Sequence, residues 1–310
     1  MGLMPSAISS ETAMPPSPSA MSEPAVSEPA VSKTSARVRI CAWDAPDAAV
    51  DPDAVDAFAF DLDNTLAVSK QPMKPDMTAC LAALLRYRPV AVITGGSFAL
   101  ASSQVIAMLD GQADLAGLHV MPTSGSSYYV WDGGAWVVRY ERTLSQPDRD
   151  AAAASLRRRA EELGLWPERP LGEPIEDRGS QITFSALGQL APAGAKQQWD
   201  PDGTKKARLV AAVAADLPHL LVRAGGYTSV DVSAGADKSF AVRELAKALG
   251  TSVGRIVFVG DRMTPGGNDY PAACAGTFAV AVTCPQDTVR WCRGAIAVLE
   301  GRSRGTSDVT

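Results

Sequence analysis

Four short apolar runs stand out along this chain, and longer segments with helical patterns lie between them. The runs are 57–60, 90–93, 255–259 and 277–282. Each run is too short for a helix and apolar on both faces, as a strand of a parallel sheet covered on both sides must be. Helical patterns at 76–85 and 239–249, the second with Asp237 as N-cap and Gly250 beyond its end, lie between runs. This alternation predicts an α/β core with a doubly wound parallel (Rossmannoid) sheet.

The middle of the chain follows a different pattern. Residues 151–163 and 204–217 are helical in composition, whereas "SQITFSAL" (180–187) and "YTSVDV" (227–232) alternate polar and apolar residues. Such alternation is typical of antiparallel strands with one buried face. We therefore expect a disordered tail rich in Ser, Pro, Ala and Glu at 1–36, the core at 37–143 and 233–310, and an α+β insertion at 144–232.

Composition narrows the function classes. The chain has 310 residues, 46% of them hydrophobic, and a net charge of −5, so no basic footprint indicates nucleic acid or an anionic membrane. Five cysteines without a CxxC pair are typical of reduced thiols in a cytoplasmic protein. The two histidines, His119 and His219, stand outside any metal-ligand pattern, which argues against a zinc site. No apolar run is long enough to span a membrane.

Polar, reactive residues follow three of the four apolar runs. They are "DLDNT" (61–65), "TGGS" (94–97) and "GDRMTPGGND" (260–269). Because ligands of open parallel sheets bind at the carboxyl ends of the strands, we expect these three loops to converge. Lys238, at the start of the helix before the third of these strands, could reach the same place.

The convergent residues suit phosphoryl transfer. Asp61 would attack phosphorus and form an aspartyl phosphate, while Asp63 would act as general acid and then as base. Thr94 and Lys238 would hold the phosphoryl oxygens as charge shifts in the transition state. Asp61 and Asp261 would bind Mg²⁺, a hard cation that prefers oxygen ligands.

Each motif also has an ordinary structural interpretation. Taken alone, a DxD after a strand is a turn with solvated carboxylates, and Lys238 is a solvated lysine at a helix start. The polar positions of the two alternating strands would be plain solvent faces. Four motifs in order at strand ends nevertheless favour an active site.

Together, "DLDNT", "TGGS", "DKS" and "GDRMTPGGND" resemble the four ordered motifs of the haloacid dehalogenase-like (HAD) phosphotransferases. The resemblance extends over about residues 57–300. It is strongest to subfamily IIB, which has an α/β cap domain inserted in the core, and within it to eukaryotic-type phosphomannomutases and related bacterial sugar phosphatases. "GDRMTPGGNDYP" is the most specific segment, and "YVWDGGAW" and "PQDTVRWC" also resemble phosphomannomutase segments.

The resemblance implies further roles. Thr94, Gly95 and Lys238 would bind phosphate. Mg²⁺ would be held by Asp61, Asp261 and the backbone carbonyl of Asp63, supported by Asn268 and Asp269. The cap residues expected near the substrate are Arg178, Gln181, Thr183, Ser229 and Asp231.

The chain departs from the mutase pattern at three positions. Gln189 stands where the pattern has an arginine, Lys196 replaces another, and Asn64 replaces the usual glycine of the first motif. Because a mutase must retain a sugar bisphosphate between the core and the cap, a neutral Gln189 favours loss of the phosphoryl group to water.

We therefore expect a cytoplasmic, Mg²⁺-dependent phosphatase of a small phosphorylated metabolite, with sugar phosphates as the expected class. A phosphomannomutase-like isomerase is the alternative, and a non-catalytic binding protein on the same fold is a third hypothesis. The partners expected are the small substrate and, through the cap, a second copy in a homodimer; neither nucleic acid nor membrane is expected.

Overall fold

The computed structural model describes residues 38–51 and 53–307, so the predicted disordered tail lies outside the described residues. The described strands form two sheets, one of eight strands and one of four. No helix in the described part of the chain is long and apolar enough to cross a membrane.

The larger sheet has the order β1-β12-β11-β2-β3-β4-β5-β6 and is parallel from β1 to β4. Its strands are β1 (Ile40–Ala42), β2 (Ala57–Phe60), β3 (Val90–Ile93), β4 (Leu118–Met121), β5 (Ser127–Trp131), β6 (Trp136–Glu141), β11 (Ile256–Gly260) and β12 (Phe278–Ala281). The four strands expected from the apolar runs are all present. The antiparallel β5 and β6 extend the sheet beyond the predicted parallel part.

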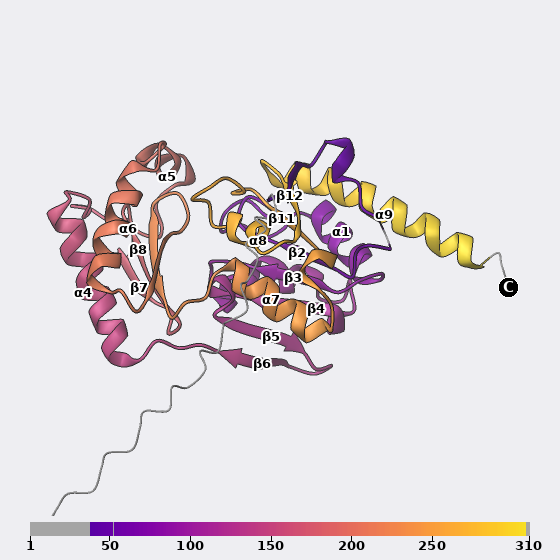
Figure 1. Ribbon diagram of the computed structural model, residues 1–310, viewed down its shortest axis with the longest axis horizontal. Helices are drawn as coiled ribbons and strands as arrows, with labels where there is room; N and C mark the ends of the chain where they lie inside the picture. Colours follow the sequence, from indigo (N-terminus) through magenta and orange to yellow (C-terminus); the bar gives the residue numbers. More distant parts are fainter. Residues whose placement is uncertain (1–37, 52, 308–310) are drawn as a thin grey trace, which may run out of the picture. The chain divides into compact units, whose positions relative to one another are not determined.

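Helices cover both faces of the larger sheet, which explains why its central strands are apolar on both sides (Figure 1). Phe58 and Phe60 of β2 pack in one hydrophobic cluster with α1 and α9, while Ala57 and Ala59 pack in the other with α7 and α8. The helices are α1 (Pro75–Leu85), α2 (Phe98–Ala101), α3 (Ala107–Leu109), α7 (Lys238–Leu249), α8 (Tyr270–Cys274) and α9 (Pro285–Ser307). We call this part of the structure the core.

The smaller sheet has the order β7-β8-β10-β9 and is antiparallel throughout. Its strands are β7 (Ile175–Asp177), β8 (Gln181–Ser185), β9 (Leu221–Ala224) and β10 (Ser229–Ser233), and its helices are α4 (Gln146–Glu162), α5 (Ala193–Trp199) and α6 (Thr204–Asp216). Phe184, Leu156 and Leu209 lie in a hydrophobic cluster of its own. We call the segment from α4 to β10 the cap. The domain limits at 143/144 and 232/233 stay predictions.

Local sequence signals explain where α7 begins and ends and where α4 begins. Asp237 caps α7, accepting hydrogen bonds from the backbone of Ser239 and Phe240, and Gly250 ends the helix in the left-handed conformation. Helix α4 begins at Gln146, five residues before the predicted start, because Ser145 supplies an N-cap ahead of Pro147. The start predicted from the alanine-rich composition, at residue 151, was therefore too late.

Candidate active site

Three carboxylates meet at the carboxyl ends of β2 and β11, which are adjacent parallel strands. Asp61 directly follows β2, Asp261 directly follows β11, and Asp269 precedes α8. Each offers a carboxylate oxygen within 4.8 Å of the others. Asp61 is only 4% exposed and Asp269 is fully buried, so their charges must be balanced by groups inside the protein.

Lys238 supplies part of that balance. Its ammonium forms an ion pair with Asp61 and a second, at 2.6 Å, with Oδ1 of Asp269, and its side chain is completely buried. Burial lowers the pKa of Lys238, but the charges of Asp269 and Asp61 outweigh this effect and raise it above its usual value. Lys238 therefore carries a positive charge at neutral pH, which suits the phosphate-binding role predicted for it.

One lysine does not neutralise three carboxylates. Burial, together with the charges of Asp269 and Asp261, raises the pKa of Asp61 well above its usual range despite the opposing effect of Lys238. Burial and the charge of Asp269 raise the pKa of Asp261 to about 7. A further cation among these oxygens would restore both carboxylates to their ionised forms.

The residues present fit a hard divalent cation. Asp61 and Asp261 offer carboxylate oxygens, and Oδ1 of Asn268 is buried and has no hydrogen-bond partner among the described residues. Asp269 is differently placed, because Oδ1 contacts Lys238 and Oδ2 accepts a hydrogen bond of 2.8 Å from the backbone of Arg262. A Cβ at Gly260 would lie 2.5 Å from Oδ2 of Asp269, so glycine is needed for this carboxylate to approach β11.

Asp63 and Thr94 complete the core side of the site. Asp63 is half-buried, and its Oδ1 accepts a hydrogen bond of 3.0 Å from the backbone of Lys70. The next residue, Asn64, has φ +62°, a left-handed conformation that asparagine tolerates better than most residues and that explains why it can replace glycine. Thr94 is 1% exposed, and its Oγ1 accepts a hydrogen bond of 3.0 Å from the backbone of Gly96.

The cap contributes polar residues from β8 and β10. Gln181 donates to the hydroxyl of Thr183, which in turn donates to Oδ1 of Asp231, at 2.9 and 2.8 Å. Burial raises the pKa of Asp231, and Arg178 and Thr183 partly oppose this rise. All five residues of β8 are buried, and its polar residues line the cleft, so the alternative interpretation of this strand as a plain solvent face does not apply.

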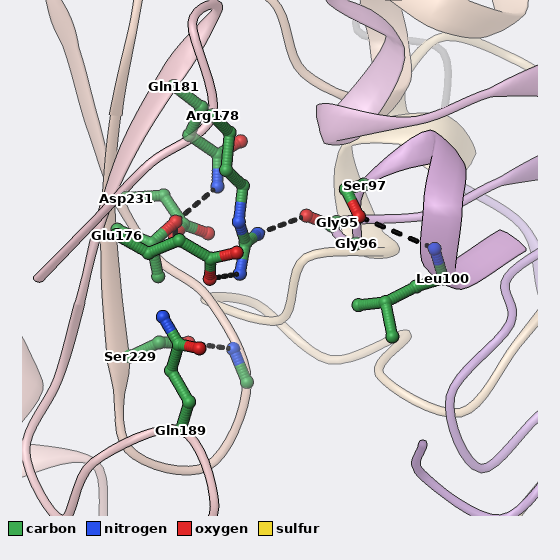
Figure 2. A network of polar contacts seen from close by, with 12 residues as sticks. Gly95, Gly96, Ser97, Leu100, Glu176, Arg178, Gln181, Gln189, Ser229 and Asp231 are labelled. Carbon is green, nitrogen blue, oxygen red and sulfur yellow. Dashed lines mark hydrogen bonds and ion pairs between the residues drawn. The ribbon is translucent and has the colours of Figure 1, made fainter. Parts of the chain in front are cut away.

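Arg178 links this polar face to the core, as Figure 2 shows. Its Nη1 donates to the carbonyl of Gly95 at 2.6 Å, and its Nη2 forms an ion pair with Glu176, also at 2.6 Å. Gln189 offers its backbone carbonyl to Lys196 and to Lys70, at 2.8 and 2.7 Å.

One cleft brings the predicted residues together. Those that line it are Asp61, Asp63, Thr94, Gly95, Arg178, Gln181, Thr183, Gln189, Lys196, Ser229, Asp231, Lys238, Asp261 and Asn268. Asp269, the remaining predicted residue, is not among the residues that line the cleft but accepts a hydrogen bond from Lys238. The roles assigned to these residues stay predictions.

Sequence reasoning missed several residues of this cleft. Lys70, Arg223, Tyr227 and Arg262 also line it. Lys70 and Arg262 could have been found, because Lys70 closely follows the first motif and Arg262 lies within "GDRMTPGGND". Arg223 is brought in by strand pairing, since it lies opposite Asp231 in the smaller sheet, and no motif signals that register.

Comparisons with known proteins show similarity to phosphomannomutases. Residues 167–298 match the family profile described as eukaryotic phosphomannomutase. Phosphomannomutase of Spinacia oleracea is 26% identical over 240 residues, which cover 75% of this chain and 92% of that protein. The resemblance of this chain to the haloacid dehalogenase-like superfamily, and within it to phosphomannomutases, is confirmed.

Solved structures show the same fold. The IMP-nucleotidase of Plasmodium falciparum bound to IMP aligns with a TM-score of 0.59 at 15% identity, covering 79% of this chain and 69% of that chain. A haloacid dehalogenase-like hydrolase of Bacteroides thetaiotaomicron aligns with a TM-score of 0.50, covering 79% of this chain and 98% of that one. The predicted fold class, a HAD-like core with an inserted α+β segment, is confirmed.

Proposed function

We propose that this enzyme is a Mg²⁺-dependent phosphatase of small phosphorylated metabolites, with sugar phosphates as its substrate class. The observation that carries the proposal is the convergence of Asp61, Asp63, Thr94, Lys238 and Asp261 on one cleft. This set can attack a phosphoryl group, protonate the leaving oxygen and balance the charge of the transition state.

Phosphoryl transfer would proceed in two steps. A carboxylate oxygen of Asp61 forms a bond to phosphorus as the bond to the leaving oxygen breaks, and Asp63 gives that oxygen a proton. Water then attacks the aspartyl phosphate, Asp63 takes its proton, and inorganic phosphate leaves. Thr94 and Lys238 donate hydrogen bonds to the phosphoryl oxygens in both steps.

The metal would be held by Asp61, Asp261, the backbone carbonyl of Asp63 and Asn268. When bound, Mg²⁺ supplies a positive charge that shields the nucleophile from the negative phosphoryl group. Asp269 would act mainly by holding Lys238, since both of its oxygens already accept hydrogen bonds.

The charges of the cap support the hydrolase over the mutase. A mutase must grip the second phosphate of a sugar bisphosphate, for which guanidinium groups are best suited. Of the two cap arginines that line the cleft, Arg178 is paired with Glu176 and Arg223 with Asp237, at 2.6 and 2.5 Å. Gln189 is neutral, so a second phosphate would be weakly retained and water would receive the phosphoryl group.

A sugar phosphate mutase is the second candidate, favoured by the similarity to phosphomannomutases over most of the chain. The two reactions separate in one assay with mannose 1-phosphate, Mg²⁺ and a trace of a hexose bisphosphate. The phosphatase releases inorganic phosphate in step with substrate loss. Fast formation of mannose 6-phosphate without matching inorganic phosphate would establish the mutase instead.

The substrate class is tested by a panel of phosphorylated sugars, nucleotides and amino acids, with inorganic phosphate as the readout. We expect sugar phosphates to give the highest kcat/KM. The amide of Gln181, the hydroxyl of Thr183 and the carboxylate of Asp231 line the cleft, where they could form hydrogen bonds with sugar hydroxyls. EDTA should abolish turnover in every case, and excess Mg²⁺ should restore it.

A further inference from the structure

The peptide group between Gly95 and Gly96 is held at both ends. Its carbonyl accepts a hydrogen bond of 2.6 Å from Nη1 of Arg178, and its N–H donates one of 3.0 Å to Oγ1 of Thr94 (Figure 2 shows the first of these). A hydroxyl has one proton to donate and two lone pairs to accept with. Because Gly96 occupies an acceptor position of Thr94, the orientation of this peptide limits the directions in which the Thr94 proton can point.

The glycines make this orientation sensitive to the contacts of the peptide group. Neither Gly95 nor Gly96 has a side chain to fix the peptide plane, and backbone freedom is greatest at glycine. A Cβ at residue 96 would lie 3.3 Å from Leu100 and 3.4 Å from Oγ1 of Thr94, so a side chain there would crowd both residues. The carbonyls of Thr94 and Gly96 accept hydrogen bonds from the backbone of Ser124 and Thr123, whereas the carbonyl of Gly95 accepts one from Arg178. Arg178 therefore adds a contact from the cap to a loop that the core already holds on either side of this peptide.

Glu176 holds Arg178 in place for this contact. The two side chains are 28% and 14% exposed, and their ion pair of 2.6 Å joins β7 to the turn that follows it. A guanidinium is planar, so fixing Nη2 on Glu176 also fixes the direction of Nη1. The partial burial of both groups strengthens the pair relative to one in open solvent.

We propose that Glu176 is a positioning residue that acts through Arg178 and the Gly95–Gly96 peptide on Thr94. This relay aims the Thr94 hydroxyl at the transferring phosphoryl group when the cap contacts the core. The inference rests on the proposed phosphoryl transfer and deepens it. It gives Arg178 a role in the chemical step, distinct from any contact with the sugar or with a second anion.

The two roles of Arg178 separate with p-nitrophenyl phosphate, a monoester without a sugar or a second anion. If Arg178 only binds distal parts of the substrate, Arg178→Gln leaves kcat for this probe unchanged. If it positions Thr94, kcat falls by roughly tenfold while KM changes little, because the lost interaction matters mainly in the transition state. Glu176→Gln should lower kcat in the same way and to a smaller extent.

A double-mutant cycle tests the route through Thr94. Thr94→Val removes the hydroxyl with little change of shape, and in that background Arg178→Gln should cause no further loss of kcat. Additive losses would overturn the relay. Arg157→Gln is the matched control: it removes the same charge from the cap, at an exposed pair with Glu161 on α4, and should leave kcat unchanged.

Different results would overturn this inference and the proposed function. A wild-type enzyme that hydrolyses no phosphate monoester would overturn both. An active wild type with an equally active Arg178→Gln variant would overturn the relay alone. Circular dichroism melts confirm in each case that the variants are folded.

Discussion

At the scale of the residue, the candidate site consists of buried charged side chains, which a hydrophobic core tolerates only when they are paired. Asp61, Asp269 and Lys238 are all at most 4% exposed, yet each contacts an opposite charge. Isolated buried charges are costly, so the arrangement persists because its members balance one another. The same arrangement leaves excess negative charge for a metal ion to neutralise.

The nucleophile gives the first prediction. Asp61→Asn should reduce turnover below detection, because an amide is a poor nucleophile and a weaker Mg²⁺ ligand than a carboxylate. Phosphate release is measured with the best sugar phosphate of the panel. Asp110→Asn, at an exposed position in the core, is the control and should keep full activity. A folded, active Asp61→Asn enzyme would rule out the aspartyl-phosphate mechanism.

At the scale of the element, the loop before β5 holds the loop at 94–97 through backbone hydrogen bonds. Thr123 N donates to the carbonyl of Gly96 and Ser124 N to that of Thr94, both at 2.8 Å. Gly125 follows with φ +88°, and a Cβ there would lie 2.5 Å from the Cβ of Ala241 in α7. The loop thus packs directly on the helix that carries Lys238.

Gly125→Ala should therefore destabilise the protein by about 2–4 kcal/mol, from overpacking against α7 and from left-handed strain. Chemical denaturation measures the change. Gly194→Ala is the control, since Gly194 has no positive φ and nothing within 4 Å of an added Cβ, and should be neutral or slightly stabilising. Equal stability of the two variants would contradict this packing.

The stability of the protein should depend on pH through His119 of β4, which contacts Tyr128 of β5. Burial lowers the pKa of His119 to about 4, and its Nδ1 lies 2.7 Å from the hydroxyl of Tyr128. Below pH 6.5 the unfolded chain gains a proton that the folded chain does not, so stability falls from pH 6.5 down to about 4. The loss from this residue is about 3 kcal/mol at most.

Urea unfolding at pH 7 and pH 5 measures this loss. His119→Gln should reduce the difference in unfolding free energy between the two pH values. His219→Gln, which changes the other, exposed histidine, should not reduce it. An unchanged pH dependence in His119→Gln would show that other groups account for the acid sensitivity.

At the scale of the whole molecule, the proposed reaction would depend on residues of the core and the cap acting on one substrate. The core would supply the nucleophile and the balancing charges, while the cap lines the cleft with hydroxyl, amide and paired charged groups. Gln189 lies where the two meet, since its carbonyl accepts from Lys70 of the core and Lys196 of the cap. A homodimer through the cap stays a prediction.

Gln189→Arg should shift the products from inorganic phosphate towards isomerised sugar phosphate. A charged donor binds a phosphate more tightly than a neutral amide by about 1.5–3 kcal/mol, roughly a tenfold to hundredfold gain in retention. The mannose 1-phosphate assay measures the product ratio. Gln112→Arg, at an exposed core position, adds the same charge away from the cleft and should leave the ratio unchanged. An unaltered ratio in Gln189→Arg would show that Gln189 does not select the reaction.

The sequence by itself determined the class of fold and the core of the site. Short apolar runs that end in Asp61, Thr94 and Asp261 predicted strands whose carboxyl ends converge, and the structure places these residues in one cleft. This succeeded because backbone periodicity and the position of a residue at a strand end are local properties, visible in a few neighbouring residues.

Only the tertiary structure decided how the charges are paired. The contacts of Lys238 with Asp269, Arg178 with Gly95 and Arg223 with Asp237 join residues that are distant in sequence or brought together by strand register. Likewise, β8 alternates polar and apolar residues as a solvent-facing strand does. Its polar residues are nevertheless buried, because they line a cleft that residues of the core also line. Alternation records that one face is polar, whereas what covers that face depends on the packing of distant segments.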